Sequence, residues 1–253
     1  MHWLISTIAE TAVETAFAHD LGLEIADFAV STILETDLTD KIAHYRQILA
    51  KLGRPSVLHA AYMELSPAAV DPALLRLTRE RYLQACRIAG ELGISRIVCH
   101  TGYMSQIYYR NWMIERSILF WRELLPQLPE GIEILLENVL EKDPFLHVEI
   151  CQGVNHPRFR VCLDLGHANS VASEYTLQEW ISVLAPWLSH IHLHDNDGTD
   201  DLHLDLGRGT IDLTPVLNHL FALCPEISLT LEVPDPEVSI SWLKKKGFFR
   251  LQS

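Results

Sequence analysis

Histidine and aspartate are concentrated in one segment of the chain, residues 188–209. Four of the thirteen histidines and five aspartates lie within it. Imidazole and carboxylate groups at this density suit a divalent metal ion such as zinc or manganese. The alternative is an acidic, histidine-rich loop exposed to solvent, and the two interpretations differ in whether other parts of the chain supply further ligands.

Further ligand-type residues recur where short apolar segments end. They are His59, His100, Glu137, Asp164, His167, His192 and Glu232. A charged side chain at the end of an apolar strand is costly if it is buried without a partner. One such residue means little, but seven at equivalent places indicate a shared partner, and we interpret that partner as metal.

These residues fall into three groups. Glu137, Asp164, His192 and Glu232 lie near the ends of four consecutive apolar segments, and three carboxylates with one imidazole suit Mn²⁺ or Zn²⁺ better than Mg²⁺. The other groups are predicted to bind a second or third ion or to contact substrate: His59 with His100, and His167 with Asp201 and His203.

The elements that must position these residues alternate regularly. Apolar segments predict strands at residues 3–6, 23–28, 56–60, 96–100, 132–138, 160–165, 188–194 and 228–233. Amphipathic segments predict helices at 9–21, 37–52, 71–92, 106–125, 144–151, 176–187 and 212–223, with a last helix after Asp235. Eight such repeats predict a single (β/α)8 TIM barrel over residues 1–253, whose carboxyl end would carry the site. A doubly wound open sheet is the rival, disfavoured by the count and by the lack of a GxGxxG motif after the first strand.

Composition restricts the classes of partner. The net charge is −13, which disfavours nucleic acid, and no apolar segment is long enough to span a membrane. The five cysteines are scattered, and the first residues lack the pattern of a signal peptide, so we expect a reducing, cytoplasmic location. A homo-oligomer is left open.

The motifs together resemble the xylose isomerase-like barrel superfamily, which includes sugar (phosphate) isomerases and epimerases and the endonuclease IV family. The resemblance covers nearly the whole chain. It is carried by Val-Cys-His100-Thr-Gly, Leu-Leu-Glu137-Asn138, Cys-Leu-Asp164-Leu-Gly-His167-Ala, His192-Leu-His-Asp, Asp201-Leu-His203-Leu-Asp-Leu-Gly207-Arg-Gly209 and Leu-Glu232.

Resemblance to the epimerases implies one metal held by Glu137, Asp164, His192 and Glu232, with the two glutamates moving a proton beside a carbonyl. Resemblance to endonuclease IV implies three zinc ions. His59, His100 and Glu137 would hold the first, the four epimerase ligands the second, and His167, Asp201 and His203 the third.

Two departures disfavour DNA repair. Residues 29–40 contain no lysine or arginine, and the segment after residue 194 is rich in aspartate, whereas DNA binding depends on neutralising phosphates. One departure disfavours an isomerase, because many sugar-processing relatives have lysine where this chain has His194.

The sequence therefore predicts a metal-dependent sugar or sugar-phosphate isomerase or epimerase that acts through an enediolate. Glu137 and Glu232 are the predicted catalytic residues, and Arg208 and Tyr62 are predicted to contact substrate. The alternative is an endonuclease IV-like multinuclear zinc phosphoesterase. A metal-dependent sugar-binding barrel without catalysis is the third possibility.

Overall fold

The computed structural model describes residues 2–171 and 173–249, and its centre is a closed barrel of parallel strands. Each strand pairs with the next along the chain, and the first pairs with the last, so the sheet has no free edge. This closure confirms the (β/α)8 barrel and excludes the open sheet. The strands are β1 (His2–Ser6), β2 (Gly22–Ile25), β3 (Val57–His59), β4 (Arg96–His100), β5 (Glu133–Glu137), β6 (Phe159–Asp164), β7 (Leu188–Leu193) and β8 (Ser228–Leu231).

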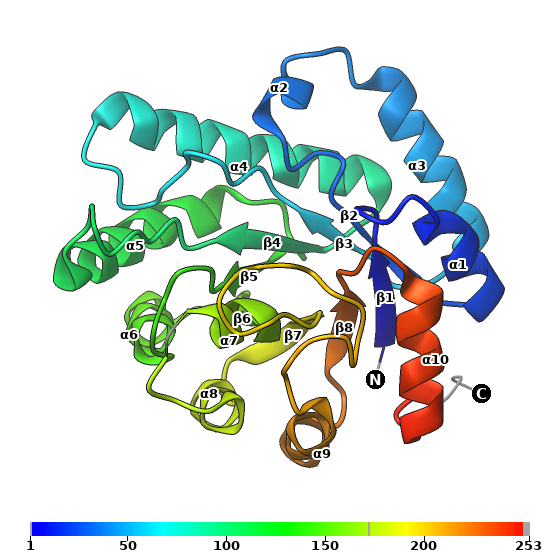
Figure 1. Ribbon diagram of the computed structural model, residues 1–253. Coiled ribbons are helices and arrows are strands. Elements are labelled where there is room, and N and C mark those ends of the chain that lie inside the picture. Colours follow the sequence, from blue (N-terminus) through cyan, green and yellow to red (C-terminus); the bar gives the residue numbers. More distant parts are fainter. Residues whose placement is uncertain (1, 172, 250–253) are drawn as a thin grey trace.

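Helices surround the strands, as Figure 1 shows. They are α1 (Ala12–His19), α2 (Ser31–Leu34), α3 (Thr39–Leu52), α4 (Pro72–Leu92), α5 (Arg110–Leu124), the 3-10 helix η1 (Leu125–Gln127), α6 (Phe145–Val154), α7 (Leu165–Ser170), α8 (Leu177–Leu184), α9 (Leu213–Leu223) and α10 (Pro236–Lys246). The yellow-to-orange segment between β7 and α9 loops across the middle of the barrel in Figure 1. None of the helices described has both the length and the hydrophobicity that crossing a bilayer requires.

The strands are apolar on both faces because each is covered on both sides. The outward-facing residues join one large core with the helices, and a separate small cluster fills part of the barrel interior. That inner cluster consists of Leu4, Val57, Val98, Leu135 and Cys162. The middle of the barrel interior is therefore a packed apolar layer. The polar and ionisable groups inside the barrel lie on either side of this layer, towards its two ends.

Two helices begin at recognisable capping signals in the sequence. The Asp71 side chain caps α4 by accepting from the Ala73 backbone N–H at 2.7 Å, and Pro72 is the first helical residue. Thr176 and Glu179 form a capping box at the start of α8.

Several boundaries differ from prediction. β2 ends at Ile25 instead of residue 28, because the Asp27 side chain turns away to accept from the hydroxyls of Thr7 (2.7 Å) and Tyr45 (2.5 Å). The short helices α2 and α7 were not predicted, and α8 ends at Leu184 rather than residue 187. β2 and α8 thus differ from prediction only at one end, whereas α2 and α7 are additional short helices in the connections after β2 and β6.

The register between β2 and the loop before β3 leads to a stability prediction. A Cβ atom on Gly22 would lie 2.0 Å from the Pro55 carbonyl oxygen. We therefore expect Gly22→Ala to lower the free energy of unfolding by about 1–3 kcal/mol, the usual cost of overpacking. Gly90 in α4 is the control, since a Cβ there meets nothing within 4 Å. Gly90→Ala should stabilise by about 0.5–1 kcal/mol. Urea unfolding checks both, and shifts of the two midpoints in the same direction would contradict the prediction.

Candidate metal centre

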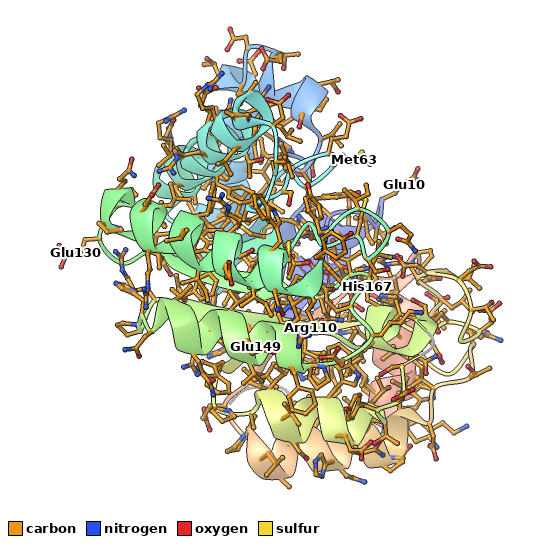
Figure 2. All side chains as sticks on the ribbon, turned by 90° about the vertical axis from the view of Figure 1, so that its left-hand side faces the viewer. Glu10, Met63, Arg110, Glu130, Glu149 and His167 are labelled. Atoms are coloured by element: carbon orange, nitrogen blue, oxygen red, sulfur yellow. The ribbon has the colours of Figure 1, made fainter. Side chains whose placement is uncertain are left out.

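The predicted ligands converge at the carboxyl end of the barrel. His59, His100, Glu137 and Asp164 are the last residues of β3, β4, β5 and β6, and His192 lies near the end of β7. Figure 2 shows His167 on the same side of the molecule as Met63, which follows β3, whereas Glu130, which precedes β5, lies at the opposite end. Parallel strands that end together thus bring residues far apart in the chain into one site.

The first ligand group joins β3, β4 and β5. The Nε2 atoms of His59 and His100 lie 3.2 and 3.1 Å from Glu137 Oε2. All three side chains are largely buried. Their ligand atoms lie within 4.8 Å of one another, close enough to hold one ion.

The central group surrounds His192 Nδ1. This nitrogen lies 3.1 Å from Glu137 Oε1, 3.4 Å from Glu232 Oε2 and 3.6 Å from Asp164 Oδ2. Glu137 therefore presents one oxygen to the first group and the other to this one. The four residues predicted to hold the principal metal are brought together.

The third group lies toward solvent. His167 Nε2 and His203 Nε2 lie 3.1 and 3.2 Å from Asp201 Oδ2, and the Asp201 side chain is 41% exposed. His194 joins this group, with its Nε2 atom 3.1 Å from Asp164 Oδ1 and its ring stacked on that of His203. The site thus runs from buried carboxylates to an exposed rim.

Backbone contacts orient several imidazoles so that Nε2 faces the site. The Nδ1 atoms of His59, His167 and His203 lie 2.9, 2.8 and 2.9 Å from the carbonyl oxygens of Ala60, Asn138 and Glu232. A second-nitrogen contact of this kind is what metal-binding histidines in proteins usually make.

The loop that carries Asp201 and His203 is fixed by the buried Asp195 carboxylate. Asp195 Oδ2 accepts from the backbone N–H groups of Gly207 and Gly209, at 3.1 and 3.0 Å. Asp195 and Leu204 also form a two-hydrogen-bond bridge, at 2.8 and 2.7 Å. Gly209 is required here, because a Cβ would lie 2.1 Å from the Asn196 carbonyl oxygen.

The residues present fit a divalent metal. The donors are imidazole nitrogens and carboxylate oxygens, the set that zinc and manganese accept. Asp164 Oδ2 is buried and has no hydrogen-bond partner among the described residues, an arrangement that a cation would satisfy.

The two predicted catalytic glutamates titrate in opposite directions. Burial raises the pKa of Glu137, but the charges of His100 and His192 outweigh it and hold the pKa well below its ordinary value. Burial raises the pKa of Glu232, and repulsion from Glu24 and Glu137 adds to this against the attraction of His192. Opposed shifts in neighbouring acids are typical of proton-transfer sites.

Metal binding should release protons. Burial lowers the pKa of His203, but its hydrogen bond with Asp201 and the charge of Glu232 raise it to about 9. His203 therefore carries a proton at neutral pH that a metal bound by the third ligand group must displace, so the affinity of that group should rise as pH increases towards 9. Calorimetric titration with Zn²⁺ at pH 7, in buffers of different ionisation enthalpy, measures this. A binding heat that is independent of the buffer would contradict it.

The two predicted substrate contacts have different surroundings. The Tyr62 ring stacks on His100 with ring centroids 4.3 Å apart, at the edge of the first ligand group. Arg208 is exposed on the turn after Asp205, and its side chain has no hydrogen-bond partner among the described residues. A substrate role for either residue stays a prediction.

Sequence reasoning missed two buried residues, Glu24 and His194. Glu24 lies inside the barrel on β2, with its Oε1 atom 3.0 Å from His192 Nε2. The sequence around Glu24, Gly-Leu-Glu-Ile, has no feature that distinguishes it from other strands. Only the alternation of side chains along a strand indicates that the Glu24 side chain points into the barrel.

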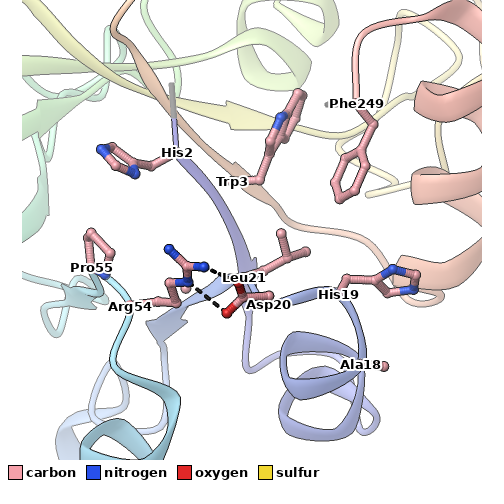
Figure 3. Close-up of a pocket in the computed structure, with 10 residues that line it drawn as sticks. His2, Trp3, Ala18, His19, Asp20, Leu21, Arg54, Pro55 and Phe249 are labelled. Carbon is pink, nitrogen blue, oxygen red and sulfur yellow. Dashed lines mark hydrogen bonds and ion pairs between the residues drawn. The ribbon is translucent and has the colours of Figure 1, made fainter. Parts of the chain in front are cut away.

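A separate cavity of about 250 Å³ lies at the opposite end of the barrel (Figure 3). It is bordered by Trp3, Phe249 and the Arg54 guanidinium, whose Nε donates to Asp20 at 2.7 Å. None of the predicted site residues lines this cavity.

Comparison with known proteins identifies the class. The family model described as xylose isomerase-like TIM barrel matches residues 15–246, and the chain belongs to this family. A solved D-tagatose 3-epimerase-like protein superposes with a TM-score of 0.81, at 23% identity over 97% of both chains. The TTHB071 protein of Thermus thermophilus, soaked with ZnCl2, gives a TM-score of 0.79 at 25% identity, covering 99% of this chain and all of the other.

Among curated proteins, the uncharacterised protein MJ1311 of Methanocaldococcus jannaschii is 30% identical over 173 residues, 65% of this chain and 59% of its own length. Probable endonuclease 4 proteins match at 23–24% identity. The chain spans only about three-fifths of the length of the first curated relatives that it matches.

Proposed function

We propose that this protein is a divalent-metal-dependent isomerase or epimerase of a small sugar or sugar phosphate. The observation that carries the proposal is the arrangement of two glutamates around one imidazole nitrogen. Glu137 and Glu232 lie 3.1 and 3.4 Å from His192 Nδ1, with Asp164 beside them. Two carboxylates held beside one another can act on one carbon, one removing a proton and the other returning it.

A metal held by Glu137, Asp164, His192 and Glu232 would supply Lewis-acid stabilisation of the charge that develops on the substrate carbonyl oxygen. Asp164 and His192 serve as ligands. Among the described residues, no donor forms a hydrogen bond with the Glu232 carboxylate, whose shortest contact with His192 Nδ1 is 3.4 Å. Both Glu137 oxygens, in contrast, lie within 3.2 Å of imidazole nitrogens. Glu232 is thus the freer of the two to move a proton, and Glu137 acts from the other side.

Charge favours a small, largely neutral substrate. The rim loop carries Asp197, Asp200 and Asp201 against a single arginine, Arg208. An acidic rim opposes the close approach of duplex DNA, whose binding depends on neutralised phosphates. The structurally similar protein named D-tagatose 3-epimerase-like also supports a sugar substrate, since its name refers to a sugar epimerase.

The proposal is tested by proton exchange. Protein loaded with Mn²⁺, Co²⁺ or Zn²⁺ is incubated in D2O with a panel of ketoses and ketose phosphates, and NMR follows deuterium at the carbon beside the carbonyl. We expect exchange with at least one substrate and a requirement for one ion per chain. Absence of exchange throughout the panel, together with cleavage of a phosphate ester, would overturn the proposal.

A multinuclear phosphoesterase is the second candidate, and the completeness of three adjoining ligand groups favours it. The three groups are His59–His100–Glu137, Glu137–Asp164–His167 and His167–His194–Asp201–His203, which share Glu137 and His167. Such an enzyme would bind two or three ions per chain and hydrolyse bis(p-nitrophenyl) phosphate or abasic DNA. Metal analysis of the purified protein, with both assays, separates it from the isomerase.

A further inference from the structure

Asn138 is a buried amide between two strands that carry ligands, and the proposed function gives it no role. It directly follows Glu137, the last residue of β5, and only 1% of it is exposed. The strand on the side of Asn138 is β6, the neighbour of β5 in the barrel (Figure 1). A buried amide needs partners for its N–H donors and its oxygen acceptor. The partners of Asn138 therefore show what this residue holds in place.

Both polar atoms of the Asn138 amide bond to the backbone of one residue, Asp164. Asn138 Nδ2 donates to the Asp164 carbonyl oxygen at 3.0 Å, and the Asp164 backbone N–H donates to Asn138 Oδ1 at 2.9 Å. The last pair in the β5–β6 ladder is Glu137 with Cys162, and β6 continues beyond it to Asp164. The Asn138 side chain thus replaces the hydrogen bonds that the backbone of a longer β5 would make with β6.

The backbone of Asn138 makes a further contact with the same region. Its carbonyl oxygen lies 2.8 Å from Nδ1 of His167, which lies in the first turn of α7. The His167 backbone N–H in turn donates to Asp164 Oδ1 at 2.7 Å. Asn138, Asp164 and His167 therefore form a closed set of hydrogen bonds in which each residue contacts the other two.

This set fixes the spacing between ligands on two strands. Glu137, the residue before Asn138, has its Oε1 atom 3.4 Å from His167 Nδ1. One ligand atom from each of Glu137, Asp164 and His167 lies within 4.8 Å of the other two, close enough for a shared ion. The Asn138 amide bonds only backbone atoms of Asp164, so it leaves Asp164 Oδ2 directed at the central group, 3.6 Å from His192 Nδ1.

We propose that Asn138 is a positioning residue that extends the β5–β6 pairing with its side chain and so holds Asp164 and His167 at metal-binding distance from Glu137. This proposal rests on the metal site of the proposed function. Both polar atoms of the Asn138 amide are engaged by Asp164, so Asn138 acts through the ligands and not as one of them. Hydrogen-bond partners behind metal ligands commonly set ligand orientation in this way.

Two substitutions of Asn138 test the proposal. Asn138→Asp keeps the shape but presents an oxygen where Nδ2 donates to Asp164, and Asn138→Ala removes both bonds without adding a charge. We expect the affinity of each variant for Co²⁺, measured by competition with a chelator, to fall about 10–100-fold. The visible absorption spectrum of bound Co²⁺, which reports the number and geometry of its ligands, should also change. Wild-type affinity and spectrum in Asn138→Ala would overturn the proposal.

Arg158→Met is the matched control, because Arg158 joins the same two strands at their other end. Arg158 precedes β6, and its guanidinium donates to three carbonyl oxygens that precede β5, those of Leu125, Pro129 and Ile132, at 3.0, 2.9 and 3.2 Å. Loss of these bonds should lower the urea midpoint but leave the Co²⁺ affinity and spectrum unchanged. An equal loss of Co²⁺ affinity in Arg158→Met and Asn138→Ala would overturn the proposal, because general weakening of the strand pair would then explain both.

NMR of the wild-type protein decides the matter even if the Asn138 variants do not fold. Scalar couplings across the two hydrogen bonds should link Asn138 Nδ2 to the Asp164 carbonyl carbon and the Asp164 amide nitrogen to Asn138 Cγ. Absence of both couplings would overturn the proposal. If the wild type binds no Co²⁺, the proposed function fails and the positioning role fails with it, whereas Co²⁺ binding that Asn138→Ala retains in full removes the role of Asn138 alone.

Discussion

Glu232→Gln should abolish solvent deuterium exchange into the substrate while the barrel stays folded. Glutamine keeps the size of the side chain, but its amide cannot accept the proton that the carboxylate takes from carbon. Loss of a general base of this kind lowers the rate about 10²–10⁴-fold. Three of the four predicted central ligands, Glu137, Asp164 and His192, remain, so the variant should still bind metal. NMR exchange rates on metal-loaded protein measure the loss.

The control for this experiment is Glu130→Gln, which removes the same charge from the exposed loop before β5. This variant should catalyse deuterium exchange into the substrate at the wild-type rate. Circular dichroism and thermal unfolding establish that both variants are folded. A Glu232→Gln protein that exchanged deuterium as fast as the wild type would remove Glu232 from proton transfer.

Glu137→Gln should have a wider effect, because this one carboxylate serves two ligand groups. Its Oε2 atom lies 3.2 and 3.1 Å from His59 and His100, and its Oε1 atom lies 3.1 Å from His192. We expect loss of deuterium exchange together with loss of bound metal. The metal-free variant should also be destabilised by about 3–5 kcal/mol, the usual cost of removing one partner from a buried ion pair.

Metal analysis and urea unfolding of metal-free protein measure these two effects separately. The contrast with Glu232→Gln is informative, since only Glu137→Gln should lose metal and folding stability as well as exchange. Retention of the full metal content by Glu137→Gln would show that Glu137 does not join the first and central groups.

The barrel and most of the centre were predictable because both depend on patterns local to each strand. The alternation of apolar strands and amphipathic helices repeats eight times, and ligand-type residues such as His100 and Glu137 close the apolar segments. Once the strands are parallel and neighbouring, their ends must lie together. The grouping of those ligands around particular atoms requires the tilt and register of the closed barrel, which no single segment contains.

Glu24 and His194 show where this reasoning stops. Glu24 contacts His192, and the two residues, on β2 and β7, meet only across the interior of the closed barrel. No local pattern in the sequence around Glu24 indicates this contact. His194 would share a face with His192 if the strand continued, but β7 ends at Leu193. Its side chain then turns to Asp164 and Asp201 and joins the rim group instead of the central one.

The Asp195 carboxylate has a consequence for the entropy of binding. Because it ties the backbone N–H groups of Gly207 and Gly209, the loop that carries Asp201 and His203 is already ordered. Ordering a free loop costs about 1–2 kcal/mol for each residue fixed, and here folding has met that cost before any ion or substrate arrives. Association at the rim should therefore be fast and lack a slow closing step, and the amides of Gly207 and Gly209 should exchange slowly with solvent in the metal-free protein.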